Sequence, residues 1–205
     1  MPKTYFTSDL HFNHAAIIAY CCRPFANIEE MNAGLLDMWN STVKDGDTVF
    51  FLGDFAMKHS VLLEYLPQLK GRITMVSGNH DKFMEFKGKE AKAKRVADEV
   101  LAACPNVVEI VQEKKIVLHG YKVLLSHFPW REDEDNHSAE HNAYKDRYTE
   151  YKPSRRDNPG HLLAFGHKHS PPSQRLGIRS VEISYDSWGK MVSSEELIEE
   201  FKKTV

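Results

Sequence analysis

Short apolar runs alternate with amphipathic stretches along the chain, and this alternation predicts strands separated by helices. Five runs have the length of strands, at residues 3–8, 48–52, 72–77, 122–125 and 162–165. The run over 48–52 is continuously apolar, which is typical of a strand buried on both faces. Two stretches with apolar residues at helical spacing, 27–43 and 89–103, predict long helices. Asn27 is a suitable N-cap for the first of these helices.

The rest of the pattern predicts further helices and a group of hairpins. Shorter helices are expected at 15–22, at 60–69 and after the caps Ser193 and Ser194, and three strands with a turn at His119-Gly120 are expected over 106–126. Helices early and hairpins later predict the α/β class, with two mixed β-sheets packed as a sandwich and flanked by helices. We expect one domain over residues 1–205.

Residues 129–160 break this regularity and are expected to form an insertion. The stretch is acidic at 132–135 and then carries aromatic and basic residues at Tyr144, Arg147, Tyr148, Tyr151, Arg155 and Arg156. Because it lies between two of the motifs described next, we expect it to overhang them as a lid. The aromatic and basic series could stack on a nucleotide and neutralise it. An amphipathic helix that packs its tyrosines inward explains the series equally well.

Each predicted strand ends at a short motif of acidic, amide or imidazole side chains. The five motifs are Asp9-Leu10-His11, Gly53-Asp54, Gly78-Asn79-His80-Asp81, Ser126-His127 and Gly166-His167-Lys168-His169. Open α/β sheets place their active sites at the carboxyl edge of the strands, where these motifs would converge. Oxygen and imidazole donors without thiolates suit Mn, Fe, Zn or Ni. The sequence therefore predicts a hydrolytic site with two divalent metal ions along one edge of a sheet.

Within the motifs, residue type separates metal ligands from a proton donor. Asp54 can bridge two cations with its two carboxylate oxygens, although it would also suit the N-cap of the following helix. Asn79 offers a neutral amide oxygen, and His127 is a further ligand, although a lone histidine after a strand is usually structural. His80 is expected to act as general acid, because the neighbouring Asp81 would stabilise and orient its imidazolium.

Together the motifs resemble the calcineurin-like metallophosphoesterase superfamily, whose pattern is D-x-H, G-D, G-N-H-D or G-N-H-E, a histidine, and G-H-x-H. The resemblance covers nearly the whole chain. The run 9–14, followed by Arg23-Pro24-Phe25, and a closing strand expected over 181–188 resemble a subgroup of small phosphoesterases, many of them from bacteria and phages. Phe165 stands where many relatives have another histidine, and the insertion looks longer than in the simplest relatives. The resemblance therefore does not supply the substrate.

The resemblance implies a ligand set and a reaction. One ion would be bound by Asp9, His11, Asp54 and His169, and the other by Asp54, Asn79, His127 and His167. A hydroxide that bridges the ions would attack phosphorus in a phosphomonoester or phosphodiester, while His80 protonates the leaving oxygen. Mn²⁺ is the favoured ion, with Fe, Zn or Ni as alternatives. The substrate would be a small phosphorylated compound, with a nucleotide among the candidates.

Four further side chains invite a functional interpretation. His14 and Arg23 lie near the first motif and could bind a substrate phosphate, because arginine offers a bidentate fork. A salt bridge at the surface or at a helix end is an equal alternative for both. His137 and His141 would share one face of a helix and could hold a metal, although solvated lid residues explain them better.

Composition narrows the partners and the compartment. A net charge of −2 argues against a long nucleic acid as the standing partner, because such binders carry a basic face. Three cysteines, two of them the adjacent pair Cys21-Cys22, are typical of a reducing cytoplasm. The sequence shows no signal peptide and no run of the ~20 apolar residues that a membrane span needs. The oligomeric state is left open.

Two functions from other classes remain as alternatives. A catalytically silent metal-binding scaffold for protein interactions would lack a working acid position, whereas His80 and Asp81 are both present. A DNA or RNA nuclease would need added binding regions and a clear basic stripe, and the sequence shows neither. The leading hypothesis is therefore a dinuclear metal-dependent phosphoesterase.

Overall fold

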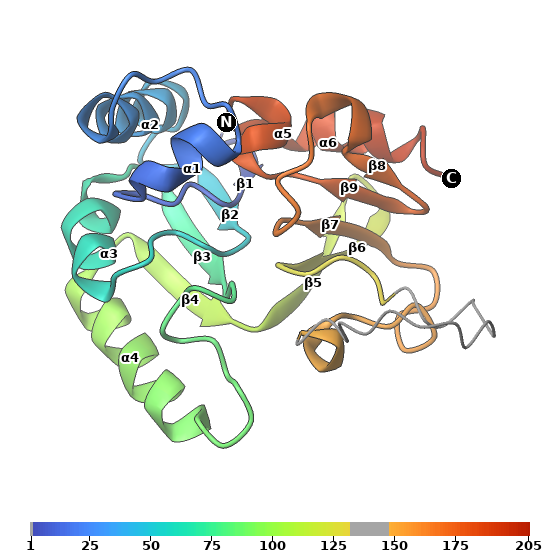
Figure 1. The fold of residues 1–205 in the computed structure, drawn as a ribbon. Coiled ribbons are helices and arrows are strands. Elements are labelled where there is room, and N and C mark those ends of the chain that lie inside the picture. Colours follow the sequence, from blue (N-terminus) through green and yellow to red (C-terminus); the bar gives the residue numbers. More distant parts are fainter. Residues whose placement is uncertain (1, 132–147) are drawn as a thin grey trace.

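Two five-stranded sheets pack against each other, with helices on the outside (Figure 1). The computed structural model describes residues 2–131 and 148–205. The strand order is β10-β1-β2-β3-β4 in the first sheet and β5-β6-β7-β9-β8 in the second. Both sheets contain parallel and antiparallel pairs. The predicted α/β class, two mixed sheets flanked by helices, is confirmed.

The first sheet carries the N-terminal motifs and is covered by the first four helices. Its strands are β1 (Thr4–Thr7), β2 (Thr48–Phe51), β3 (Arg72–Val76), β4 (Val107–Val111) and β10 (Val192–Ser193). Strands β1 to β4 pair in parallel, and β10 pairs antiparallel with β1. The helices on its outer side in Figure 1 are α1 (Ala15–Tyr20), α2 (Ile28–Thr42), α3 (His59–Tyr65) and α4 (Glu90–Ala103).

The second sheet carries the C-terminal motifs. Its strands are β5 (Glu113–Leu118), β6 (Tyr121–Ser126), β7 (Leu162–Phe165), β8 (Leu176–Gly177) and β9 (Ser180–Glu182). Strands β6, β7 and β9 are parallel, so their carboxyl ends meet at one edge. The remaining elements are the helices α5 (Tyr185–Trp188) and α6 (Ser194–Phe201) and the 3-10 turns η1 (Leu66–Gln68), η3 (Thr149–Tyr151) and η4 (Pro172–Gln174).

Alternating side chains of the first sheet supply two separate apolar layers. Phe51 and Met75 pack with Trp39 of α2 in the layer between sheet and helices. Phe6 points the other way and packs with Val123 of β6 in the layer between the sheets. Burial of side chains of this size contributes about 1.5–3 kcal/mol each. Packing in both layers therefore fixes the positions of the strand ends that carry the motifs.

Local capping explains where several helices begin. The Asn27 side chain accepts a hydrogen bond from the Glu30 backbone N–H, as expected for the N-cap of α2. Ser193 and Glu196 form a reciprocal capping box at the start of α6. The helix expected over 60–69 is shorter: α3 ends at Tyr65 and continues as the 3-10 turn η1, which contains a proline.

The prediction of a closing strand over 181–188 is wrong for the second half of this range. Strand β9 ends at Glu182, and α5 begins at Tyr185. Between them the Ser184 hydroxyl donates to a Glu182 carboxylate oxygen at 2.8 Å, and the Ser187 N–H donates to the Ser184 carbonyl. Serine hydrogen bonds of this local kind favour a turn over continued strand pairing.

The predicted insertion is only partly covered by the described residues. Residues 132–147 lie outside them, and with them the expectations for His137, His141, Tyr144 and Arg147. From Tyr148 to residue 160 the chain contains the 3-10 turn η3 rather than the longer helix expected there. Among the described helices, none combines the length and apolarity needed to cross a membrane.

Candidate metal centre

The predicted ligands come together where strand ends of both sheets meet. Asp9, Asp54 and Asn79 follow β1, β2 and β3 of the first sheet, whereas His127 and His167 follow β6 and β7 of the second. The expectation of a single sheet edge is therefore too simple. The site lies at the junction of two carboxyl edges, which explains why its ligands are so widely spaced in sequence.

The backbone at the motifs is unusually strained. Nine described residues other than glycine have a positive φ, and five of them are predicted ligands: Asp9, His11, Asp54, His167 and His169. Their φ values, from 52° to 75°, lie in the left-handed region, which costs a residue with a Cβ atom about 1–3 kcal/mol. Such strain clusters at functional sites because the surrounding structure holds the side chains in place.

The motif glycines allow the loops to approach one another closely. A Cβ atom at Gly78 would lie 2.4 Å from the Asp54 backbone nitrogen, and one at Gly53 would lie 2.6 Å from the Gly78 Cα. A Cβ atom at Gly166 would lie 2.4 Å from Asp9 Oδ2. These separations are too short for any side chain, so the glycines are required by the contact between loops.

Asp54 lies within 4 Å of imidazoles from three different motifs. Its Oδ2 atom is 3.7 Å from His11 Nε2, 3.6 Å from His127 Nε2 and 3.8 Å from His80 Nε2. Donors that bind one ion at about 2.1 Å lie roughly 3–4 Å from one another. The Asp54 carboxylate could therefore be shared by the donors around His11 and the donors around His127.

The first group of donors consists of Asp9, His11 and His169. Asp9 Oδ1 is 3.5 Å from His169 Nε2, and the Nε2 atoms of His11 and His169 are 3.3 Å apart. Asp9 Oδ1 is buried and has no hydrogen-bond partner. Since a buried carboxylate oxygen without a partner is costly, a cation among these three side chains would resolve the defect.

The second group of donors surrounds His127. Its Nε2 atom is 3.0 Å from Asn79 Oδ1 and 3.2 Å from His167 Nδ1. Its Nδ1 atom is 2.8 Å from the Leu52 carbonyl oxygen, which can only accept, so Nδ1 carries the proton. Nε2 then presents a lone pair toward the Asn79 oxygen. Two acceptors that face each other at this distance are explained by a cation between them.

Asp186 and Arg23 support the first group of donors through hydrogen bonds. Asp186 Oδ2 accepts a hydrogen bond from His169 Nδ1 at 2.6 Å, which leaves Nε2 directed at the site. The Arg23 guanidinium donates to both Asp186 oxygens at 2.8 Å. It also donates to the carbonyl oxygens of Asp9 and Leu10, each at 2.7 Å. One arginine thus ties the first motif to the helix that orients His169.

This arrangement changes the expected role of Arg23. Its side chain is 1% exposed and its donors are directed at protein atoms, so it does not offer the free fork that phosphate binding requires. The structural alternative, a salt bridge, describes it better. Sequence reasoning missed Asp186. The available signal was that a buried arginine after the first motif needs an acidic partner.

Burial and like charges shape the electrostatics of the site. Burial, with Asp9 next, raises the pKa of Asp54 well above its usual range. Burial, with His169 next, lowers the pKa of His11 well below its usual range, which favours the neutral imidazole that a metal requires. For His169, burial lowers the pKa, but Asp186 and Asp9 outweigh it and raise the pKa to about 9. The carboxylates that raise the pKa of His169 would also attract a metal cation.

His80 and Asp81 occupy different positions relative to the site. The His80 side chain is 34% exposed, while its backbone N–H donates to Asp54 Oδ1 at 2.9 Å. The Asp81 carboxylate accepts from the backbone N–H groups of Gly78, Asp54 and Phe55. Burial, with Asp54 next, raises its pKa to about 7. Asp81 therefore anchors two motif loops, and its expected role in orienting His80 stays a prediction.

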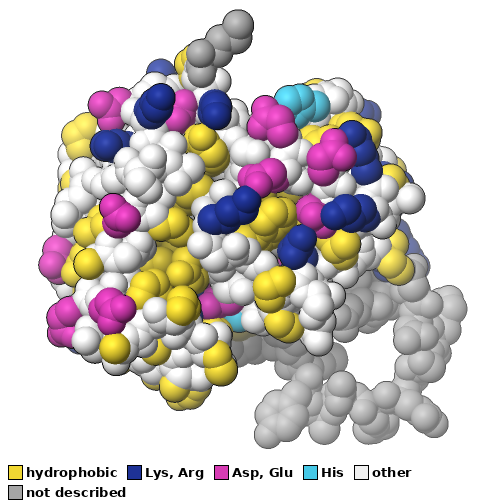
Figure 2. Space-filling view, turned by 90° about the horizontal axis from the view of Figure 1, so that it is seen from above, with side chains coloured by type: hydrophobic (Ala, Val, Ile, Leu, Met, Phe, Trp, Pro, Cys, Tyr) yellow, Lys and Arg dark blue, Asp and Glu magenta, His cyan; other side chains and the backbone are white. Residues whose placement is uncertain are grey.

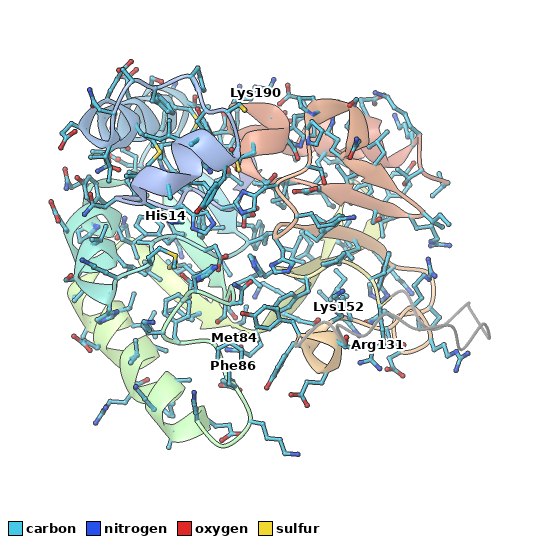
Figure 3. All side chains as sticks on the ribbon, in the orientation of Figure 1. His14, Met84, Phe86, Arg131, Lys152 and Lys190 are labelled. Carbon is cyan, nitrogen blue, oxygen red and sulfur yellow. The ribbon has the colours of Figure 1, made fainter. Side chains whose placement is uncertain are left out.

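His14 directly precedes helix α1 (Figure 3). Its ring centroid is 5.6 Å from that of His11, and its Nδ1 atom is buried without a hydrogen-bond partner. Burial, with Arg23 next, lowers its pKa. Contact with a substrate phosphate stays a prediction for this residue.

The donor set fits two divalent ions. It consists of two buried aspartates, one amide and four imidazoles, with two of the imidazoles fixed by hydrogen bonds from their other nitrogen. Such a mixture of oxygen and nitrogen ligands suits Mn, Fe, Zn or Ni. The ligands would divide into the Asp9 group and the His127 group, with Asp54 shared.

Comparison with known proteins supports this interpretation. A family profile described as calcineurin-like phosphoesterase matches residues 2–185. The chain is 32% identical over 212 residues to the gene 66 protein of Mycobacterium phage L5, which covers 96% of this chain and 93% of the phage protein. It is 52% identical over 88 residues to an uncharacterized protein of Methanocaldococcus jannaschii, covering 42% of this chain and half of that protein.

One solved structure is similar over nearly its whole length. It is a protein of unknown function from Aquifex aeolicus, with 27% sequence identity and a TM-score of 0.66. The alignment covers 97% of this chain and 99% of that chain. The Aquifex protein therefore has the same fold as this chain.

Proposed function

Because the chain belongs to the calcineurin-like phosphoesterase family, we propose that it hydrolyses a phosphomonoester or phosphodiester bond in a nucleotide or another small phosphorylated compound. The observation that carries the proposal is the position of Asp54, whose Oδ2 atom lies between His11 and His127 at 3.7 and 3.6 Å. A shared carboxylate between two sets of donors is what a two-ion phosphoesterase needs.

The residues of the centre would hold two divalent ions, for which Mn²⁺ is our first choice. When bound, such ions activate water at neutral pH and neutralise charge on the phosphate oxygens. Asp9, His11 and His169 would hold one side, and Asn79, His127 and His167 the other. Asp54 fixes the spacing between the two sides.

His80 is the proposed general acid. Its Nε2 atom is 3.8 Å from Asp54 Oδ2, yet its side chain reaches the surface, whereas Asp9, His11 and His127 are at most 2% exposed. A side chain in this position can meet the leaving oxygen of a substrate whose phosphate lies at the ions. Donation of its proton would contribute about 10²–10⁴-fold to the rate.

A small substrate also fits the surface and the composition. Lys and Arg are interspersed with Asp and Glu on the described face shown in Figure 2, without a continuous basic stripe there. The net charge of the chain is −2. Long nucleic acids are bound through extended basic surfaces. The three cysteines are free thiols, which supports our proposal of a reducing, cytoplasmic setting.

The first experiment measures metal content and hydrolysis together. Protein loaded with Mn²⁺ should bind two ions and release p-nitrophenol from bis-p-nitrophenyl phosphate. We expect His80→Ala to lower turnover of an alkyl phosphoester, whose poor leaving group needs a proton, about 100-fold or more while two ions are retained. His119→Ala, at an exposed hairpin turn, is the matched control and should change neither quantity. Two bound ions with no turnover on any phosphoester would instead support a catalytically silent scaffold.

A further inference from the structure

A cleft beside the metal centre has no assigned role. Its volume is about 500 Å³. Charged side chains are among the residues that line it, including Lys115, Arg131, Lys152, Glu85 and Asp157. Figure 3 shows Met84 on the loop before α4, on the same side of the molecule as Arg131 and Lys152. Pockets of this size hold ligands larger than an inorganic phosphate.

The cleft is connected to the metal ligands through one aromatic residue. Phe128 lines the cleft and directly follows His127 in the chain. Its ring centroid lies 5.0 Å from the rings of both His127 and His167. The Tyr148 ring packs next to it, 5.3 Å from Phe128 and 5.7 Å from His167. The Phe128 ring therefore borders both the cleft and the predicted metal ligands.

The chain also connects the cleft to the proposed general acid. His80 is followed within a few residues by Met84 and Glu85, which line the cleft. The loop is held at this place because the Glu85 N–H donates to the Gln112 side chain and the Lys87 N–H donates to the Tyr151 hydroxyl. The loop that follows the proposed general acid therefore forms part of the cleft wall.

The interior of the cleft combines an apolar surface with a free donor. Met84 and Phe128 are buried apolar residues, and Tyr151 and Pro153 lie opposite in the segment after residue 147. The Arg131 Nη2 atom donates to the Lys152 carbonyl oxygen at 3.4 Å, whereas its buried Nε atom has no hydrogen-bond partner among the described residues. A buried guanidinium donor without an acceptor is costly, so an acceptor from a ligand would be strongly favoured.

We propose that this cleft binds the organic group of the substrate, a partly apolar group of nucleoside size whose acceptor atom pairs with Arg131. The proposal rests on the phosphoesterase function proposed above and narrows its substrate class. Apolar contacts with Met84 and Phe128 supply most of the affinity, and the arginine supplies selectivity. Phosphoesters with a small organic group leave the cleft unused.

The test compares two p-nitrophenyl esters that differ in the group retained on phosphorus. One is thymidine 5′-(p-nitrophenyl phosphate), and the other is methyl p-nitrophenyl phosphate. We expect the wild-type protein to have a KM about tenfold lower for the thymidine ester. Arg131→Ala should raise that KM about tenfold, because a charged hydrogen bond is lost. It should leave the methyl ester kinetics and the metal content unchanged.

Two further variants make the result decisive. Arg95→Ala, on an exposed position of α4, is the matched arginine control and should change neither ester. Glu85→Trp places a bulky ring at the rim from an exposed position and should impair only the thymidine ester. Equal KM values for both esters in the wild type, or an equal effect of Arg131→Ala on both, would overturn the proposal.

The cleft can also be tested when no ester is cleaved. In that event the proposed function fails, and calorimetric titration of Mn²⁺-loaded protein with thymidine 5′-monophosphate decides the inference. Binding that Arg131→Ala weakens about tenfold, and Arg95→Ala does not, supports the cleft as a ligand site. An absence of binding, or binding that both variants leave unchanged, rejects it.

Discussion

His169 belongs to the first group of donors and His127 to the second, and the two rings are held by different means. The Nδ1 atom of His127 is fixed by a backbone carbonyl, that of Leu52, at 2.8 Å. The Nδ1 atom of His169 is fixed by the Asp186 side chain at 2.6 Å, with Arg23 behind it. One side of the centre therefore depends on strand geometry, and the other on a buried charged network.

The two kinds of support predict different sensitivity to mutation. A backbone carbonyl at a strand end persists as long as β2 is formed, so no single side chain removes it. A carboxylate and its arginine come from two distant parts of the chain, the segment after α1 and the helix α5, and either can be lost. Single substitutions can therefore weaken the support of His169 more easily than the support of His127.

The largest effect is expected where both sides meet. Asp54→Ala removes the shared ligand, so it should release at least one ion and lower phosphoester turnover by about a thousandfold or more. Ion content by elemental analysis and hydrolysis of bis-p-nitrophenyl phosphate measure the two effects. Asp37→Ala, at an exposed position of α2, is the control. If Asp54→Ala kept both ions at full occupancy, the bridging position would be refuted.

A smaller effect, confined to one side, is expected from Asp186→Ala. Loss of a carboxylate behind a histidine ligand lowers metal affinity about 10–100-fold. Titration with Mn²⁺ should show one weakened ion and one ion of unchanged affinity. Asn79→Ala is the matched variant on the opposite side and should weaken the other ion. The comparison fails if both variants weaken the same ion, or if Asp186→Ala weakens both equally.

Much of the centre could be predicted because each motif directly follows an apolar strand in the sequence. Each motif follows an apolar strand, so periodicity placed the strands, and the carboxyl ends of parallel strands placed Asp9, Asp54 and Asn79. The sequence could not show that His127 and His167 belong to a second sheet. That arrangement depends on how two sheets pack, which no short pattern encodes.

The parts that were missed depend on tertiary contacts between distant residues. Asp186 lies 163 positions from Arg23, and its strand-like surroundings predicted no helix at this place. The Asp81 carboxylate accepts from backbone amides of the loops at Asp54 and Gly78, and these contacts between loops are not visible in the sequence. The left-handed backbone at the ligands is equally invisible in sequence, because these residue types are not glycine.

The smallest effect on ion binding is expected from Arg23→Ala. Arg175→Ala is its matched control, and the comparison tests the role of the buried charged network. Both arginines bind a carboxylate and lie over an aromatic ring, Arg23 with Asp186 and Arg175 with Glu200. Arg23 is buried, so its loss should lower the free energy of unfolding by about 3–5 kcal/mol. Affinity for one Mn²⁺ should fall a few-fold, less than in Asp186→Ala, because His169 keeps its carboxylate.

Arg175 is partly exposed, and its loss should cost about 1 kcal/mol or less and leave both ions unchanged. Urea denaturation and Mn²⁺ titration distinguish the two variants. Equal losses of stability, with unchanged ion binding in both, would show that Arg23 supports the fold without acting on the centre.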